Sequence, residues 1–204
     1  MKTLLNVSLF ASAIVYYPAY AEHTPLVDFT KPINRIQVLT DATERSAGLS
    51  HAYAGYQNSQ NNKSHFFFAH LKPQPNGAAF ATFRVADNFN LQYPYSICLN
   101  GKSLNDKDAY YQVVIETPKS QSLGFTYKQD FQVQSQENFS MPFYFSEFDA
   151  TRRGKNFPNA PSLNPSDIKS VAIRIIGRAG QEADIYQKGL FGLQLFNFTL
   201  DCEN

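Results

Sequence analysis

Hydrophobic residues recur at every second position along much of the chain, which is the period of a β-strand with one buried face. Val171, Ile173 and Ile175 fall on one face of such a stretch, and Tyr111 and Val113 begin another. Runs dense in Phe, Tyr, Val and Ile predict further strands at His65–Leu71, Ala78–Val85, Tyr95–Leu99, Leu123–Phe131, Phe139–Phe145 and Leu190–Leu200. The phenylalanines of these runs that we expect in the core include Phe66, Phe68, Phe80 and Phe191.

Turn residues bound most of the predicted strands, and helical signal is scarce. Pro73–Gly77 predicts one turn, and Asn100-Gly101 and Gly177–Gly180 mark others. Asn58–Asn62 is predicted to be a loop tip, and Asn164–Asp167 predicts a single capped helical turn. About eight or nine main strands with few short helical turns indicate an all-β, jelly-roll-type β-sandwich. No linker divides residues 22–204, so we expect one domain there.

The first 21 residues have the layout of a secretory signal peptide. Lys2 supplies the positive start, a mostly apolar stretch follows, and Pro18 precedes the cleavage pattern Ala19-Tyr20-Ala21. The apolar stretch is too short to anchor the chain in a bilayer. We therefore expect Met1 to Ala21 to be removed and the protein to be secreted or periplasmic.

The only two cysteines are Cys98 and Cys202. In an exported protein an even pair suggests a disulfide, here closing a loop of about 100 residues. The alternative is two buried thiols that never meet.

Charge changes the picture by what it excludes. The chain holds 18 Lys+Arg against 17 Asp+Glu, so we expect no electrostatic capture of nucleic acid.

After residue 21 no apolar stretch is long enough to span a membrane as a helix. With 43% apolar residues the chain can build a core, and we expect a monomer.

Catalytic and metal-binding patterns are absent from the sequence. Four histidines are too dispersed for a zinc site, and His65 and His70 are predicted on opposite faces of one strand. No zincin, nucleophile-elbow or phosphate-loop motif occurs. Glu147 and Asp149 could serve a glycosidase, with Asp130 and Glu116 on other strands, but such carboxylates are more often solvated strand ends. We predict no catalytic residue, no metal and no cofactor.

Two kinds of side chain remain as candidate ligand contacts. Tyrosines near predicted turns either pack at sandwich edges or stack on sugar rings, and a basic cluster at 152–155 could grip an anion. The candidate ligand contacts are Tyr53, Tyr56, Tyr144, Arg152 and Arg153. If the source is a eukaryote, the glycosylation sequons are at Asn62, Asn138 and Asn197.

Short patterns recur in a fixed order along the chain: Gly77–Ala81, Gly124–Tyr127, Met141–Phe143, Ser146–Phe148, Arg153–Lys155, Pro158–Ile168 and Lys188–Leu193. In this order and spacing they resemble the NADH:ubiquinone oxidoreductase intermediate-associated protein 30 family. The resemblance runs from about Val38 to Phe198 and implies a galactose-binding-like β-sandwich. The best-known members are mitochondrial assembly factors of respiratory complex I that act as chaperones. The predicted secretory signal directs this chain elsewhere, so the resemblance carries the fold and not the complex I role.

These observations favour an exported, non-enzymatic binding module, of the assembly-factor or chaperone-like kind, whose partner is an exported protein. The alternative is a carbohydrate-binding module that uses loop tyrosines to hold a glycan, and the third class is a hydrolase. A cleft of convergent polar side chains would favour the sugar. A broad apolar patch would favour a protein partner.

Overall fold

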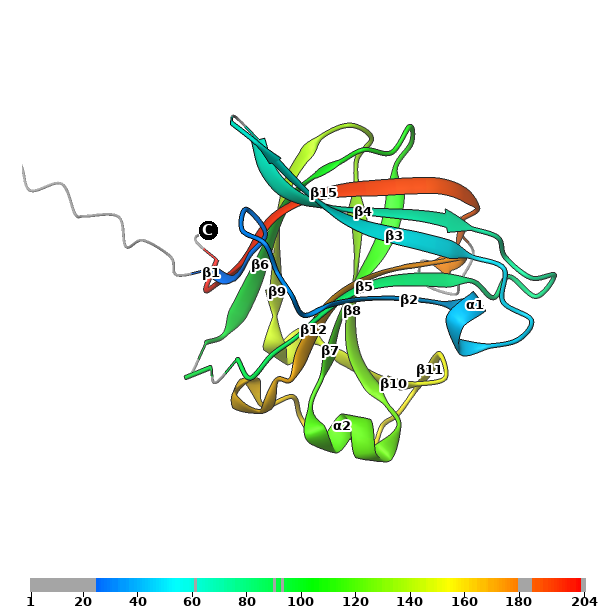
Figure 1. Cartoon of the computed structure of the whole chain (residues 1–204). Coiled ribbons are helices and arrows are strands. Elements are labelled where there is room, and N and C mark those ends of the chain that lie inside the picture. Colours follow the sequence, from blue (N-terminus) through cyan, green and yellow to red (C-terminus); the bar gives the residue numbers. More distant parts are fainter. Residues whose placement is uncertain (1–24, 61, 90, 93, 180–184, 203–204) are drawn as a thin grey trace, which may run out of the picture.

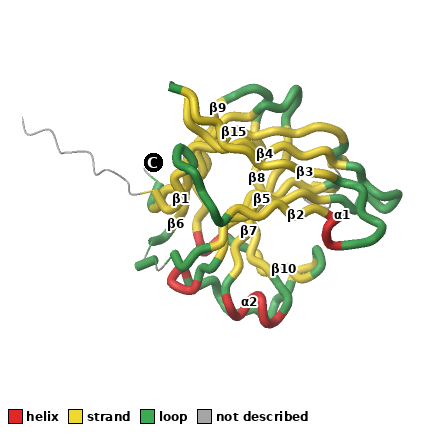
Figure 2. The backbone as a smooth tube through the Cα atoms, viewed as in Figure 1, coloured by secondary structure: helices red, strands yellow, loops and turns green. Residues whose placement is uncertain are grey.

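The computed structural model describes residues 25–60, 62–89, 91–92, 94–179 and 185–202. The predicted signal peptide and its cleavage site lie outside these residues. Most of the described chain is strand, with short helical segments at a few connections (Figure 2). No helix among the described residues is both long enough and apolar enough to cross a membrane.

Two antiparallel sheets face each other (Figure 1). Within the described residues, one is six-stranded, in the order β3, β4, β15, β6, β9, with β1 added to β15. Their bounds are β3 His51–Ser59, β4 Asn62–Leu71, β15 Gly189–Leu200, β6 Ser96–Ser103, β9 Asn138–Tyr144 and β1 Pro25–Asp28.

The other sheet is seven-stranded over the same described ranges, in the order β11, β10, β8, β7, β12, β5, β2. Its bounds are β11 Lys155–Asn156, β10 Asp149–Arg152, β8 Thr126–Val133, β7 Ala109–Glu116, β12 Ser170–Ile176, β5 Phe80–Ala86 and β2 Ile36–Thr40. The remaining elements are β13 Arg178–Ala179, β14 Ile185–Tyr186, α1 Asp41–Glu44, α2 Pro118–Leu123 and the 3₁₀ turns η1 Phe145–Glu147 and η2 Pro165–Asp167. The predicted all-β sandwich is confirmed.

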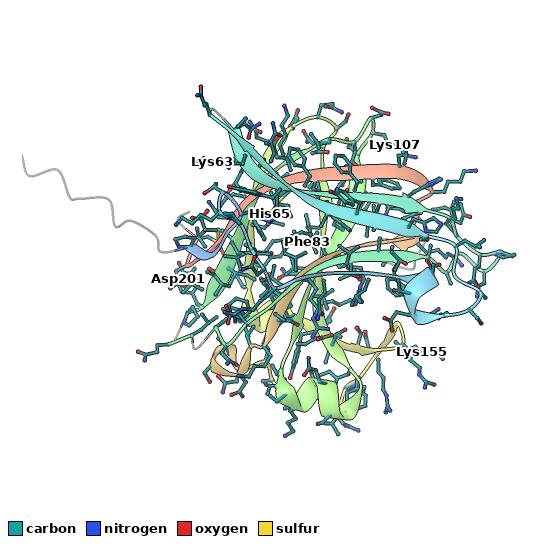
Figure 3. The ribbon with its side chains drawn as sticks, viewed as in Figure 1. Lys63, His65, Phe83, Lys107, Lys155 and Asp201 are labelled. Atoms are coloured by element: carbon teal, nitrogen blue, oxygen red, sulfur yellow. A yellow bond between two sulfur atoms is a disulfide. The ribbon has the colours of Figure 1, made fainter. Side chains whose placement is uncertain are left out.

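The core fills the space between the sheets, as the alternation predicts. Tyr111, Val113 and Ile115 of β7 are buried, and so are the inward residues of β12. Phe83 and His65 lie between the layers (Figure 3), with ring centroids 6.4 Å apart. His65 is buried and its Nδ1 is 2.9 Å from the carbonyl oxygen of Phe29. His70 lies on the opposite face of β4, as predicted.

Three of the four expected core phenylalanines are not fully buried, and this expectation was wrong. Phe191 is buried at 4% exposure, whereas Phe68 is 44% exposed and Phe66 and Phe80 are partly exposed. The reason is the period of two: Phe67 points into the core, so its neighbours must point outward. Rings therefore cover part of the outer faces of both sheets.

Two local predictions also need correction. The predicted strand at 123–131 begins at Thr126, because Thr117 caps α2 and Gly124 ends it in the left-handed conformation at φ 70°. Gly101 lies inside β6 instead of in a turn. A Cβ there would come within 2.6 Å of the Gln194 carbonyl oxygen, so the glycine permits close approach of β15.

Cys98 of β6 and Cys202, just after β15, form the predicted disulfide. Their Cα atoms are 5.5 Å apart, and the bond closes a separation of 104 residues. The capped turn predicted at Asn164–Asp167 is also confirmed as η2, with Asn164 as its cap.

Candidate functional site

The outer face of the seven-stranded sheet holds a groove of about 1500 Å³. Its floor comes from β5, β12, β7 and β8, and its rim from α1, the end of α2 and the β10–β11 turn. Figure 1 shows α1 and β11 on the same side of the molecule, at the right of the view. We call this hollow the groove.

Strand register places four polar side chains in one row across the groove. Thr82, Arg174, Gln112 and Asp130 occupy directly opposed positions on β5, β12, β7 and β8. Within the row the Arg174 Nε donates to the Thr82 Oγ1 at 3.1 Å, and the Gln112 Nε2 donates to the Asp130 Oδ1 at 2.7 Å. Arg174, Gln112 and Asp130 line the groove, whereas Thr82 is 2% exposed and serves as the acceptor for Arg174. The row therefore offers donors and acceptors along a line that crosses three strands.

A second row runs parallel to the first. Arg84 and Lys128 stand at its ends, and Ala172 and Val114 lie between them. The two short side chains are buried although they face outward, because longer neighbours cover them. Polar side chains and apolar ones such as Phe80 and Phe125 therefore share the surface of the groove.

Ion pairs engage most of the groove's carboxylates. Glu116 lies 2.7 Å from the Arg84 guanidinium and accepts further hydrogen bonds from Ser170 and Gln121. Lys128 lies 3.3 Å from Asp130. These contacts hold the side chains in fixed positions in the groove.

Arg174 stands at the centre of the groove without a carboxylate partner among the described residues. Its guanidinium carbon lies 5.6 Å from the centre of the Phe80 ring. Burial lowers the pKa of Arg174; Glu116 raises it and Arg84 lowers it further, through longer-range charge interactions. A guanidinium nevertheless keeps its charge in proteins.

Local structure fixes the groove's rim. α1 begins at a capping box formed by Thr40 and Thr43, and Arg45, which follows it, places its guanidinium carbon 5.8 Å from the centre of the Phe80 ring. Across the groove, Arg153 and Gly154 form the β10–β11 turn with φ 53° and 77°. The two sides therefore each present an arginine to the groove.

The structure separates the candidate contacts that the sequence suggested. Arg153 lines the groove, whereas the guanidinium carbon of Arg152 lies 5.9 Å from the Phe157 ring centre. Tyr56 donates its hydroxyl to the Thr30 carbonyl at 2.9 Å, and Tyr144 stacks on Tyr95. Tyr53 lies on the outer face of the other sheet. Only Arg153 of this predicted set faces the groove.

That outer face of the six-stranded sheet carries an apolar hollow of about 460 Å³. Tyr53, Phe68 and Leu190 line it and are 67%, 44% and 80% exposed. Phe66 stacks on Phe68 with ring centroids 5.9 Å apart. We call this surface the apolar face.

The sequon asparagines differ in exposure. Asn62 and Asn138 are exposed, whereas Asn197 is partly buried and its Oδ1 accepts a 2.7 Å hydrogen bond from Asn100.

The backbones of Glu116 and Asp130 are well separated: they lie on adjacent strands four positions apart in register, which is about 13 Å along the sheet. Each carboxylate is paired with a cation, Glu116 with Arg84 and Asp130 with Lys128. No three His, Cys, Asp or Glu side chains gather into a metal-binding group within the described part of the chain.

Sequence reasoning missed Arg174 and Gln112, and it named Glu116 and Asp130 only as candidate glycosidase carboxylates. Arg174, Gln112 and Glu116 are visible as the polar positions of two alternating strands. The signal shows that they share outward faces, but only the pairing of β5, β12, β7 and β8 brings them into one row.

The fold and the groove define a β-sandwich of the ligand-binding class. The family model of Complex I intermediate-associated protein 30 (CIA30) matches residues 27–195. The chain therefore belongs to this family, as its sequence patterns predicted. No curated protein matches the chain in sequence.

Solved structures of carbohydrate-binding modules share the fold. The family 11 module of a cellulosomal cellulase of Clostridium thermocellum matches with a TM-score of 0.61 at 9% identity, covering 91% of this chain and 97% of the module. A structure of the family 11 module from Clostridium thermocellum in complex with a β-1,3-1,4-mixed-linked tetrasaccharide matches with a TM-score of 0.57 at 10% identity, over 85% of this chain and 92% of that one. An agarase matches with a TM-score of 0.57 at 11% identity, over 88% of this chain and 26% of its own. Family and fold together support a non-catalytic binding domain.

Proposed function

We propose that this protein is a glycan-binding domain that holds a saccharide chain in the groove of the seven-stranded sheet. The observation that carries the proposal is the row of Arg174, Gln112 and Asp130, all of which line the groove floor. A sugar presents hydroxyl groups along its length, and each can donate and accept. A row of fixed donors and acceptors matches that pattern.

Size and fold add to the proposal. The groove's 1500 Å³ exceeds the volume of about 300–1,000 Å³ typical of small-ligand sites and suits an extended ligand. The family 11 module solved with a tetrasaccharide is an instance of this fold that carries a saccharide. In this proposal the polar residues of the groove floor bind the sugar, in place of the loop tyrosines that the sequence suggested.

The proposal is tested by isothermal titration of the purified protein with oligosaccharides of different backbones. For one that binds, Gln112→Ala should weaken binding about three- to tenfold, because it removes a polar contact from the row. Tyr53→Ala, on the apolar face, is the matched control and should bind as the wild type does. Failure of every oligosaccharide to bind, or equal loss in both variants, would contradict the proposal.

The apolar face favours a second candidate function, the binding of another protein, as an assembly factor would do. An exposed group of Tyr53, Phe68 and Leu190 suits contact with another protein. Leu190→Asp should abolish capture of such a partner while leaving the fold intact, because Leu190 is 80% exposed. A partner retained by Leu190→Asp and lost by Gln112→Ala would place protein binding in the groove instead.

We further propose that the protein works outside the cytosol. The Cys98–Cys202 disulfide supports an oxidising compartment, in keeping with the signal peptide predicted from the sequence. Mass spectrometry of the exported protein should find Glu22 at its N-terminus. An intact Met1 on that protein would contradict this.

A further inference from the structure

We propose that the groove selects anionic saccharides, with Arg174 binding a carboxylate or sulfate on the sugar. This rests on the proposed glycan-binding function and narrows its ligand class. Selection by charge depends on which of the groove's charged side chains are already paired.

The groove's unpaired charge is mainly positive. Glu116 is paired with Arg84 and Asp130 with Lys128, so neither is free to attract a cation. Among the described groove residues, only one carboxylate, Glu44, lies outside an ion pair, and it is exposed at the rim.

Three guanidinium groups stand against that one carboxylate. Arg45, Arg153 and Arg174 all line the groove, and none forms an ion pair within the part of the chain that the structure describes. Arg178 also lies there but is already engaged. The whole chain is almost neutral, with 18 Lys+Arg against 17 Asp+Glu. The excess of positive charge in the groove is therefore local and is not a property of the whole surface.

Among these arginines, Arg174 is the strongest candidate for binding an anionic group, because neighbouring side chains fix its position. The Thr82 hydroxyl fixes its Nε at 3.1 Å, and the Phe80 ring lies 5.6 Å from its guanidinium carbon. Its two terminal nitrogens make no hydrogen bond with any described residue. A planar pair of N–H groups fits a carboxylate or sulfate through two parallel hydrogen bonds.

Partial burial strengthens the inference. Glu116 acts on Arg174 at longer range but is already paired with Arg84, so the burial cost of the Arg174 charge is offset only in part. An anionic sugar group would supply a direct partner. Arg45 and Arg153, on opposite sides of the rim, would meet further anionic groups along the same chain.

The test compares a neutral oligosaccharide with two anionic forms of it, one carrying carboxylates and one carrying sulfates. Oligogalacturonate and the neutral galactose oligomer of equal length and linkage are titrated into the purified protein at low and at high salt, together with a sulfated form of the neutral oligomer. We expect at least about tenfold tighter binding of one anionic form, weakened by salt. The form preferred distinguishes a carboxylate ligand from a sulfate ligand.

Variants assign the effect to residues. Arg174→Gln should remove the preference, and Arg174→Lys should restore it only in part, because lysine keeps the charge but not the planar pair. Arg153→Gln should weaken anionic binding about threefold or more. Arg152→Gln is its matched control, since the neighbouring arginine packs on Phe157, and should change nothing. Arg153 is exposed in a turn, so its variant tests the proposal even if Arg174→Gln does not fold.

Three other results of the titrations would overturn the proposed preference for anionic sugars. Equal binding of neutral and anionic oligomers that Gln112→Ala weakens would overturn this inference and leave the glycan-binding function standing. Binding of neither, while a neutral oligosaccharide of another backbone binds in the groove, would overturn the inference alone, and failure of every oligosaccharide to bind would overturn both. Equal competition by polyphosphate would show attraction of any polyanion, which also overturns the inference.

Discussion

At the scale of single residues, polar side chains form hydrogen bonds with the backbone where strands and helices end. Asp28, the last residue of β1, accepts hydrogen bonds from the Thr30 amide at 3.0 Å and from the Thr30 hydroxyl at 2.5 Å. Lys31 lies 2.9 Å from the same carboxylate. Burial acts to raise the pKa of Asp28, but the hydrogen bonds and charge of Thr30 and Lys31 outweigh it, so the pKa lies below its ordinary value.

This lowered pKa predicts a pH dependence. A carboxyl whose pKa falls on folding stabilises the fold above its unfolded pKa of about 3.9, and that contribution is lost as pH falls through the folded value. Asp28→Asn keeps the turn's acceptor but not the charge. Urea unfolding at pH 7 and at pH 2 should therefore show a smaller loss of stability on acidification in Asp28→Asn than in the wild type. An equal loss would contradict the assignment.

Asn105 is a second such residue, and it links the two sheets. It is 2% exposed, and its Oδ1 accepts from the Gly192 amide at 2.8 Å and from the Tyr111 hydroxyl at 3.3 Å. Burial raises the pKa of Tyr111, which Asn105 opposes only in part, so the phenol keeps its proton and donates.

Removing this link should destabilise the protein. Asn105→Ala leaves two buried donors unpaired and should lower the free energy of unfolding by about 2–4 kcal/mol. Combined with Tyr111→Phe, which removes one of those donors, the loss should be less than the sum of the single losses. Strictly additive losses in urea unfolding would show that the two side chains do not interact.

At the scale of elements, strands with strong alternation were predictable, whereas the edge strands β2 and β3 were not. β4, β7 and β12 bury one whole face, so their alternation is strong in the sequence. β2 and β3 are sheet edges, and β3 is mostly exposed or half-buried. Their patterns are weak because an edge strand buries less and tolerates polar residues. α2 was missed because its short sequence depends on caps at Thr117 and Gly124, not on periodicity.

The disulfide ties two elements that the chain order keeps apart. It anchors the segment after β15 to β6 across 104 residues. Replacing both cysteines by alanine should lower the free energy of unfolding by about 2–4 kcal/mol, because a long loop in the unfolded chain is no longer closed. Reductant should destabilise the wild type by a similar amount and leave the double variant unchanged. A double variant as stable as the wild type would contradict this role.

At the scale of the whole molecule, the sandwich presents two different outer faces. The groove mixes polar with apolar side chains and carries guanidinium groups outside ion pairs among the described residues, whereas the apolar face displays rings and Leu190. Sequence predicted the layers and the disulfide. It did not predict the groove, because Arg174 and Gln112 are far apart in the sequence and become neighbours only through the pairing of β12 with β7. It also misassigned Phe68, whose outward direction follows from the burial of Phe67.

The most direct test of the account is amide chemical-shift mapping of the ¹⁵N-labelled protein with a saturating oligosaccharide. The account predicts shifts that follow the groove, at Thr82, Arg174, Gln112 and Asp130, with β3 and the outer positions of β4 unchanged. Shifts centred on Tyr53, Phe68 and Leu190, with the groove silent, would contradict it and assign ligand binding to the apolar face.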